Sequence, residues 1–292
     1  MYYILYPLLY VLSLLPFRVL YIISNFFSYL AYRVFKYRRA VVEHNLALAF
    51  AHKSLQQRNV IAKQFYTNLI DTFMESLKFI SISKRALLKR STGEFDLIND
   101  LIAQGKNVHL MACHQFNWEY ANLLYALKLT KPFVGVYMPI SNKALDAIFY
   151  NFRCKYGTIL ISAADFKSKM HTVFNNQYLL GLAADQNPGN PQYAYWMHFM
   201  GQPTPFVTGP AKGAVRNNTA VVMVGFHKVK RGYYHFTTEL LTADAAAATP
   251  QQITLLYKNA LEKIIHQDPA NYLWSHRRWK YTYNQAYGPM LD

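Results

Sequence analysis

Short, continuous apolar runs alternate with helical patterns through the middle of the chain. The apolar runs are Val108–Ala112, Phe133–Tyr137, Thr158–Ser162, Tyr178–Ala184 and Ala220–Phe226. The segments with helical spacing between them are Asn117–Lys128, Lys143–Tyr156 and Asp165–Phe174. Strands that are apolar on both faces and alternate with helices are typical of parallel sheets buried between helices. The pattern therefore predicts an α/β fold with a mostly parallel sheet that helices cover on both faces.

More helices and one antiparallel strand are predicted around this sheet. Helical spacing of apolar residues extends over Ala40–Phe50, Arg58–Ile80 and Gln252–Gln267. Glu94–Gln104 is a further helix, and Gly105 stands where a glycine commonly ends a helix. A turn at residues 230–232 leads into Tyr233–Leu241, whose apolar and polar residues alternate. This alternation predicts a strand that pairs antiparallel.

The first 32 residues are almost entirely apolar and predict a membrane anchor. No basic segment precedes the run and no small-residue cleavage site follows it, so a cleaved signal peptide is not expected. A bilayer span needs about 20 residues. Tyr2–Phe17 is therefore short alone, whereas adding Val19–Tyr32 gives sufficient length across Pro16 and Arg18. A tilted span, a re-entrant hairpin, an interfacial helix and a helix pair buried against the domain all remain open.

Positive charge follows the apolar segment and dominates the whole chain. The flanking cations are Arg33, Lys36, Arg38 and Arg39. By the positive-inside rule, this flank and the domain over residues 33–292 stay in the cytoplasm. The chain has 31 Lys and Arg against 15 Asp and Glu, with 24 Tyr, which suits an anionic membrane surface. It has no nucleic-acid-binding motif or zinc spacing, so no nucleic acid partner is expected.

The first apolar run is followed by a histidine and then by a carboxylate, His114 and Glu119. In open α/β sheets, sites gather beyond the carboxyl ends of strands. Residues five apart on one helix lie about 140° apart, so the two side chains meet only if His114 lies in the turn and Glu119 at the helix start. Asn117 is a suitable N-cap for that helix. In this arrangement a neutral His114, held by Glu119, acts as a general base.

The same spacing is compatible with a buried structural histidine and a surface glutamate. No G-x-S-x-G nucleophile motif and no H-E-x-x-H or C-x-x-C metal motif occurs. Cys113 adjoins His114, but neighbouring residues at a strand end point to opposite sides. Cys113 and Cys154 are expected as reduced thiols. A base without a nucleophile indicates direct deprotonation of an incoming hydroxyl or amine, and no metal or cofactor is expected.

Five blocks in order resemble the bacterial lipid A late acyltransferases, the lauroyl and myristoyl transferase family, over nearly the whole chain. The blocks are Arg39–Phe50, His114–Glu119, Val136–Asp146, Ala184–Pro188 with Met197–Ala211, and Tyr272–Lys280. They are similar to the family's R…NL…F, H-x4-D/E, V-Y-R-P…N…D, D-Q-x-P…F-x-G-x-P…T-G-x-A and Y-x-W-x-H-R-R-F-K motifs. The resemblance implies a core similar to the glycerol-3-phosphate acyltransferase fold.

The resemblance also implies roles for individual residues. His114 is the base and Glu119 its partner. Four other positions are expected to bind substrate: Arg153, Asp185, Tyr137 and Asn142. Arg153 would hold a phosphate or the developing oxyanion; its alternative is a solvated helix face. Asp185 is the second acidic position, with a cap or turn residue as its alternative. Met138 replaces the family's Arg between Tyr and Pro, which removes a cation and puts the acceptor in question.

Two other groups allow both a functional and a structural interpretation. Trp274, Trp279 and the basic run 276–278 near the C-terminus would bind a headgroup or the membrane interface, or are solvated residues of a folded end. The apolar side chains Met197, Phe199, Met200 and Phe206 would line an acyl-chain groove or pack in the core.

The leading hypothesis is an acyltransferase at the bacterial inner membrane, with its catalytic domain, residues 33–292, on the cytoplasmic face. It would move an acyl chain from an acyl carrier protein thioester, or acyl-CoA, to a hydroxyl of a lipid A precursor or related lipid. A lysophospholipid or amino-acid lipid acceptor would use the same chemistry. The other classes are a lipid or thioester hydrolase, in which water replaces the acceptor, and a non-catalytic membrane-surface protein.

Overall fold

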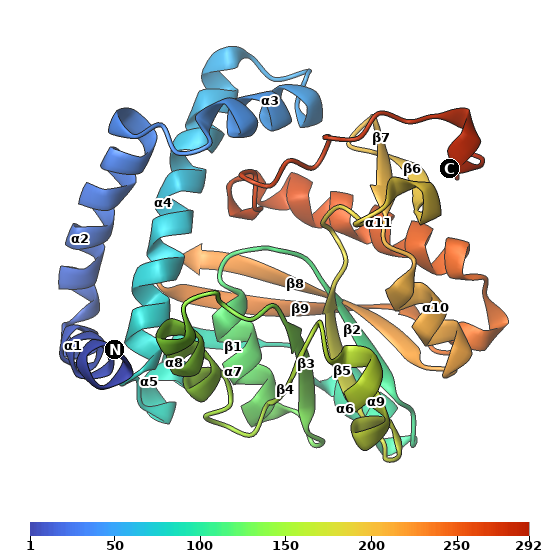
Figure 1. The fold of residues 1–292 in the computed structure, drawn as a ribbon, viewed down its shortest axis with the longest axis horizontal. Coiled ribbons are helices and arrows are strands. Elements are labelled where there is room, and N and C mark those ends of the chain that lie inside the picture. The colour runs from blue at the N-terminus through green and yellow to red at the C-terminus, as the bar shows by residue number, and fades with distance from the viewer. Residues whose placement is uncertain (292) are drawn as a thin grey trace.

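A seven-stranded sheet forms the centre of the computed structural model, which describes residues 1–291 (Figure 1). Its order is β1-β9-β8-β2-β5-β3-β4. The strands are β1 (Ser91–Gly93), β2 (Val108–Ala112), β3 (Phe133–Tyr137), β4 (Ile159–Ser162), β5 (Leu179–Ala183), β8 (Ala220–Lys230) and β9 (Tyr233–Thr242). The five strands from β8 to β4 run parallel, and β9 pairs antiparallel with β8. The predicted α/β class, the mostly parallel sheet and the antiparallel strand are confirmed.

Helices pack against the sheet through two large apolar cores and a small third one that α9 covers. The helices that follow the N-terminal apolar segment are α3 (Arg39–Ala49), α4 (Leu55–Phe79), α5 (Lys84–Arg90), α6 (Asp96–Ala103), α7 (Trp118–Lys128), α8 (Lys143–Arg153), α9 (Phe166–Phe174), α10 (Gly209–Arg216) and α11 (Pro250–Gln267). Along β2, Leu110 joins the core with α6 and α7, whereas Met111 joins the core with α4, α10 and α11. Because successive strand residues point to opposite faces, the continuous apolar run supplies both large cores.

The end of α6 follows the predicted helix-stop signal. Gly105 has a φ of 81°, in the region that favours glycine. Its N–H donates to the carbonyl of Ile102, and the Lys106 N–H donates to the carbonyl of Leu101. These two bonds satisfy carbonyls that the helix leaves open and turn the chain into β2.

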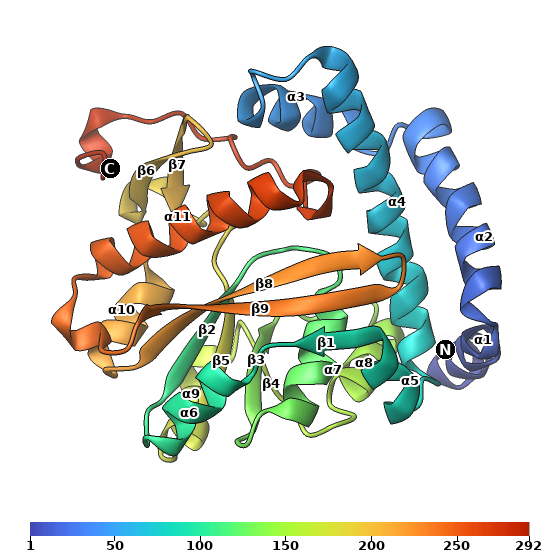
Figure 2. The same cartoon turned by 180° about the vertical axis from the view of Figure 1, so that it is seen from behind.

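The N-terminal apolar segment forms a bent helical hairpin, α1 (Tyr2–Leu14) and α2 (Phe17–Tyr29), which a π-helical turn at Leu30–Val34 extends. Within residues 1–291, no single helix is long and apolar enough to cross a bilayer; α1 together with the segment Phe17–Val34 reaches that length, with a bend of 111°. The hairpin lies along α4, at the edge of the molecule (Figures 1 and 2).

Polar contacts join the inner side of the hairpin to α4 and the β8–β9 tip. Lys78 Nζ donates to the carbonyls of Ser13 and Leu15, at 2.7 and 2.9 Å. Ser24 Oγ donates to the buried carboxylate of Asp71 at 2.6 Å. Asp71 also forms ion pairs with Arg231, at 2.6 Å, and with Lys228. Because removing one partner from a buried ion pair is costly, these contacts hold the hairpin against the domain.

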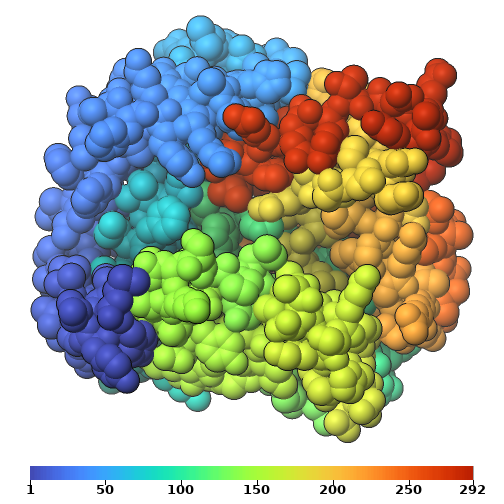
Figure 3. All heavy atoms as spheres, in the orientation of Figure 1, coloured from blue at the N-terminus to red at the C-terminus, as the bar shows by residue number. Residues whose placement is uncertain are grey.

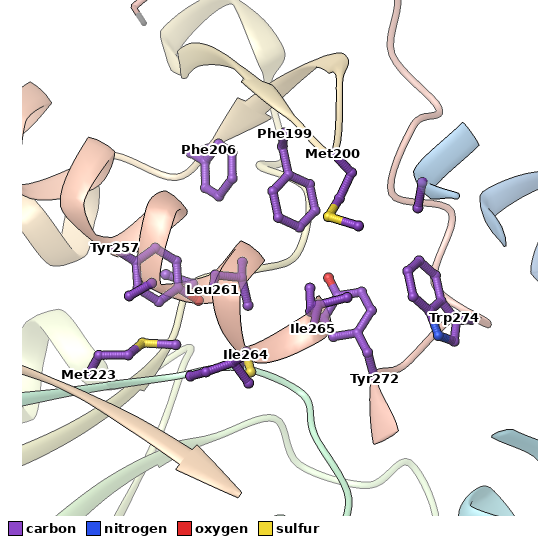
Figure 4. Packing of buried hydrophobic residues seen from close by; sticks show 14 of the residues in the cluster. Phe199, Met200, Phe206, Met223, Tyr257, Leu261, Ile264, Ile265, Tyr272 and Trp274 are labelled. Carbon is purple, nitrogen blue, oxygen red and sulfur yellow. The ribbon is translucent and has the colours of Figure 1, made fainter. Parts of the chain in front are cut away.

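A β-hairpin that the sequence patterns did not predict, β6 (Tyr195–Phe199) and β7 (Gln202–Phe206), packs above α11. Figure 4 shows Phe199, Met200 and Phe206 reaching from this hairpin toward Leu261 and Ile265 on α11. These side chains are buried in the core, so the core-packing interpretation holds for them. The sequence patterns did not predict β7 because it contains Pro203 and Pro205, and proline occurs in strands only at sheet edges.

Candidate active site

His114 and Asp185 occupy matching positions beyond two neighbouring strands. In the parallel pair β2 and β5, Ala112 lies opposite Ala183. His114 comes two positions after Ala112, and Asp185 comes two positions after Ala183. The order of the sheet inserts β5 between β2 and β3. As a result, two residues 71 positions apart in the chain meet at the carboxyl edge of the sheet.

The Asp185 carboxylate holds the His114 imidazole from behind. His114 Nδ1 lies 2.8 Å from Asp185 Oδ1, and the His114 backbone N–H donates to Oδ2 at 3.0 Å. The Asp185 side chain is 1% exposed, whereas the His114 side chain is 28% exposed. The buried carboxylate accepts a hydrogen bond from Nδ1–H, so in the neutral imidazole the lone pair is on Nε2, which faces away from Asp185. The pair has the geometry of the histidine and carboxylate in a catalytic triad.

Burial and charge act in opposite directions on both members of this pair. Burial lowers the pKa of His114 and the Asp185 carboxylate raises it, with a net upward direction. Burial raises the pKa of Asp185, while the His114 charge and backbone N–H lower it, with a net downward direction. Asp185 is therefore ionised and favours the imidazolium, which is the form that a general base reaches after taking a proton.

Glu119 forms an ion pair with Arg153. Arg153 Nε donates to both carboxylate oxygens of Glu119, at 3.1 and 2.9 Å, and Nη2 makes a third, close contact. Among the described residues no hydrogen bond joins Glu119 to His114, and the structure corrects that expectation. The helix begins at Trp118, as the Asn117 cap predicted, with Asn117 Oδ1 accepting from the Glu119 N–H at 3.0 Å. Glu119 lies in the first turn of α7 and faces the end of α8, not the imidazole.

The turn between His114 and α7 is fixed by groups that local patterns did not identify. Asn117 Nδ2 donates to Glu75 Oε2 at 2.9 Å, and Tyr234 donates to the same oxygen. The Phe116 N–H donates to the carbonyl of Asn271 at 3.0 Å. Burial raises the pKa of Glu75 above its usual range. One signal for these contacts was present in the sequence: Glu75 is an acidic residue on the apolar face of the predicted helix 58–80.

A cavity of about 480 Å³ opens beside this pair and extends between the sheet and α7. Its walls include three polar side chains, His114, Glu119 and Arg153, and a larger apolar set to which Ala121 and Tyr125 belong. Glycines of β3 and β5 also line it: Gly135 and Gly181. A Cβ at Gly181 would lie 2.5 Å from the Phe133 ring. The absence of a side chain at Gly181 therefore makes room for the Phe133 ring, which itself forms part of the cavity wall.

The remaining predicted positions separate into cavity and scaffold. Tyr137 and Met138 line the cavity, and Met138 is 75% exposed. Asn142 instead caps α8, its Oδ1 accepting from the N–H groups of Ala144 and Leu145, at 3.0 and 3.2 Å. Arg153 and Asp185 are not the solvated helix residue and simple turn residue that were their alternatives, because each is paired with another predicted site residue.

Cys113 lies at the cavity wall and is buried. Burial and the nearby Asp185 carboxylate raise the pKa of the Cys113 thiol well above its usual range. A raised pKa disfavours the thiolate, which is the nucleophilic form of cysteine. The site therefore has a base and an ion pair around an apolar cavity, without an activated thiol.

Comparison with known proteins agrees with this geometry. The family profile described as bacterial lipid A biosynthesis acyltransferase matches residues 1–281. The lipid A biosynthesis lauroyltransferase of Escherichia coli (strain K12) is 22% identical over 268 residues, covering 91% of this chain and 87% of the relative. The match over nearly the full length leads to one conclusion: this chain belongs to the bacterial lipid A biosynthesis acyltransferase family.

Proposed function

We propose that the protein transfers an acyl chain from a thioester donor to a lipid hydroxyl, with His114 as general base and Asp185 as the residue that orients it. One observation carries this proposal: His114, bonded from behind by the buried Asp185, lines a mainly apolar cavity. An acyl chain in this cavity would bring its carbonyl carbon beside His114. The acceptor hydroxyl would then approach from the open side, where Nε2 faces.

The chemistry requires only the polar groups in and behind the cavity wall. His114 Nε2 removes the proton from the acceptor hydroxyl while the oxygen attacks the thioester carbonyl. The tetrahedral intermediate collapses, the carbon–sulfur bond breaks, and the thiolate takes the proton from the imidazolium. An ester and a free thiol result, and no acyl-enzyme forms. Asp185 stabilises the imidazolium through the bond to Nδ1, as the carboxylate does in a triad.

Arg153 supplies the positive charge in this wall. Its guanidinium faces the cavity and is held by Glu119 through three contacts. Arginine remains charged at any physiological pH, so it can stabilise a developing oxyanion or a substrate phosphate whatever the state of His114. In this assignment Glu119 positions Arg153, in place of the contact with His114 that the sequence suggested.

The donor and acceptor are proposed by chemical class. The net charge of +16 attracts an acidic acyl carrier protein as donor. The acceptor is a lipid A precursor or a related lipid with a free hydroxyl. In the cavity wall, Met138 is the residue expected to adjust this choice, because an exposed thioether takes the place of the arginine found in the resembling motif.

The direct test is an acyl transfer assay with His114→Ala. The purified protein receives an acyl carrier protein thioester and extracted lipids, and mass spectrometry identifies the acylated product. We expect the variant to lose a factor of about 10²–10⁴ in rate, with unchanged unfolding temperature as the control for folding. Full activity of the folded variant would refute the assignment. Thiol release without any lipid acceptor would instead indicate a hydrolase.

We also propose that the N-terminal hairpin lies within the membrane interface on the cytoplasmic side of the bacterial inner membrane. Each of α1 and α2 has 13 residues, about 20 Å of helix against a hydrocarbon core of about 30 Å. Their inner sides are held to α4, while their outer sides expose large apolar residues. These include Tyr3, Ile4, Leu8, Val11, Ile22 and Phe26. Such a surface, flanked by cations, suits the boundary between headgroups and acyl chains.

Charge on the outer side of the hairpin tests this placement. Ile22→Glu with Phe26→Glu should reduce binding to anionic phospholipid vesicles by at least about tenfold, because two exposed apolar side chains no longer insert. Leu240→Glu with Leu256→Glu is the matched control, since both residues are exposed but lie on β9 and α11. Equal losses in both variants, or none, would contradict the placement. Flotation of vesicles with bound protein measures the binding of each variant.

A further inference from the structure

Two sequence blocks that the proposed chemistry does not use meet in the structure. Arg39–Phe50 forms α3, and Tyr272–Lys280 forms the segment after α11. Asn45 Nδ2 donates to the carbonyls of Trp274 and His276, at 2.8 and 2.7 Å, and is buried. In Figure 3, the red C-terminal segment lies directly against the blue α3 region. One asparagine therefore joins segments more than 200 residues apart.

A groove of about 350 Å³ opens where these blocks meet. Its walls are Ala40, Val41, His44, Asn45, Arg277, Trp279 and Lys280. Arg277, Lys280 and His44 are exposed, and the set contains no carboxylate among the described residues. The neighbouring carboxylate, Glu43, is occupied by Arg39 at 2.7 Å. Cations around a concave site with an aromatic wall are suited to an anionic group of fixed size.

The C-terminal segment that lines the groove is hydrogen-bonded to the loop that carries Asp185. Asn187, two residues after Asp185, donates from Nδ2 to the Arg277 carbonyl at 2.6 Å. Its backbone N–H donates to His276 Nε2 at 3.2 Å. Burial and the nearby Arg278 lower the pKa of His276 to about 4, so His276 is neutral and can accept this bond. The segment that carries Arg277 and Lys280 is thus bonded directly to the loop that carries Asp185.

The groove also adjoins the proposed membrane surface. Helix α3 follows the π-helical end of the hairpin at Leu30–Val34 after a few residues. The groove is therefore formed in part by the helix that directly follows the hairpin. An acidic protein would need a broad, convex cationic face, whereas this site is a groove of about 350 Å³, a volume typical of small-molecule sites.

We infer that the groove between α3 and the segment Arg277–Lys280 binds a phosphate group of the acceptor's lipid headgroup. The identity of that lipid as the acceptor rests on the proposed function; the phosphate binding itself does not. Arg277 and Lys280 neutralise the phosphate, and His44 and Trp279 border it. A headgroup held here leaves a hydroxyl elsewhere on the same lipid free to reach His114.

The test measures binding without catalysis. The full chain carrying Arg277→Gln and Lys280→Gln is compared with Lys89→Gln and Lys131→Gln, exposed residues outside the groove that remove the same charge. The affinity of each variant and of the unaltered chain is measured for vesicles of phosphatidylcholine alone and for vesicles that also contain phosphatidic acid. We expect the groove variant to lose roughly 10- to 30-fold in affinity for the phosphatidic acid vesicles only. The matched variant should lose much less. Titration with inorganic phosphate shows whether a free phosphate suffices.

The outcomes are distinct. Equal losses in the two variants would overturn the inference, since general surface charge would then explain them. So would an unchanged phosphatidic acid affinity, or a loss confined to binding of acyl carrier protein. Weak binding of inorganic phosphate that the groove variant abolishes supports the site and assigns the remaining affinity to the lipid. His114→Ala should bind all vesicles as the unaltered chain does, so failure of the catalytic assignment leaves this result intact.

Discussion

Two buried carboxylates lie near the same cavity, Glu119 in its wall and Asp185 behind His114, and they differ in the group that each one holds. Asp185 is bonded to His114, a group that gains and loses a proton near neutral pH. Glu119 is bonded to Arg153, which stays charged. The first pair can move a proton, and the second provides a constant field. The partner of each carboxylate, more than its place in a motif, thus indicates its part in the reaction.

The largest effect that separates the two pairs is expected from Asp185→Asn. Removing the carboxylate leaves Nδ1 without its acceptor and the imidazolium without stabilisation, so the rate should fall on the order of 10³-fold. Asp185 raises the pKa of His114. Without it that pKa falls, and the neutral base persists to lower pH. The acidic limb of the kcat/KM profile should therefore move to lower pH.

The same pH profile decides which carboxylate serves His114. Glu119→Gln is expected to leave the position of the acidic limb unchanged, because Glu119 holds Arg153. If the acidic limb of the profile shifts with Glu119→Gln and not with Asp185→Asn, the assignment is reversed, and Glu119 is the partner of His114 as the sequence suggested.

The next effect concerns stability. Glu119→Gln leaves the largely buried Arg153 without its partner, and we expect a loss of about 2 kcal/mol in the free energy of unfolding. Glu119→Gln combined with Arg153→Met should lose less than the sum of the single variants. Glu119→Gln combined with His114→Ala should be additive within about 0.5 kcal/mol. Denaturant unfolding measures both cycles, and strong coupling between His114 and Glu119 would contradict the separation of the pairs.

The smallest effect is expected inside the cavity that both pairs border. Ala121→Phe narrows the apolar part of the cavity and should exclude about two methylene groups. At about 0.8 kcal/mol for each methylene, the preference for long over short acyl donors should fall roughly tenfold. Competition between donors of different length measures it, with exposed Ala247→Phe as the control. If Ala121→Phe shows the same preference for donor chain length as Ala247→Phe, the acyl chain binds elsewhere.

Local patterns predicted the elements that line the site. The β2 and β3 runs were predicted with their observed bounds, because apolar residues on both faces leave few alternatives for a short segment. Asn117 and Gly105 were predicted as helix boundaries from backbone chemistry alone. The β6–β7 hairpin and α10 were missed, because their prolines and short lengths give no periodic signal.

The sequence by itself determined most of the elements, the histidine beyond the end of β2 and the family, since these depend on residue type and local spacing. Only the tertiary structure decided which carboxylate meets that histidine. The order β2-β5-β3 brings Asp185 beside His114, and the docking of α8 brings Arg153 to Glu119. Sheet order depends on packing between residues far apart in the chain, so an interval of five residues could not reveal that the true partner lies 71 residues away.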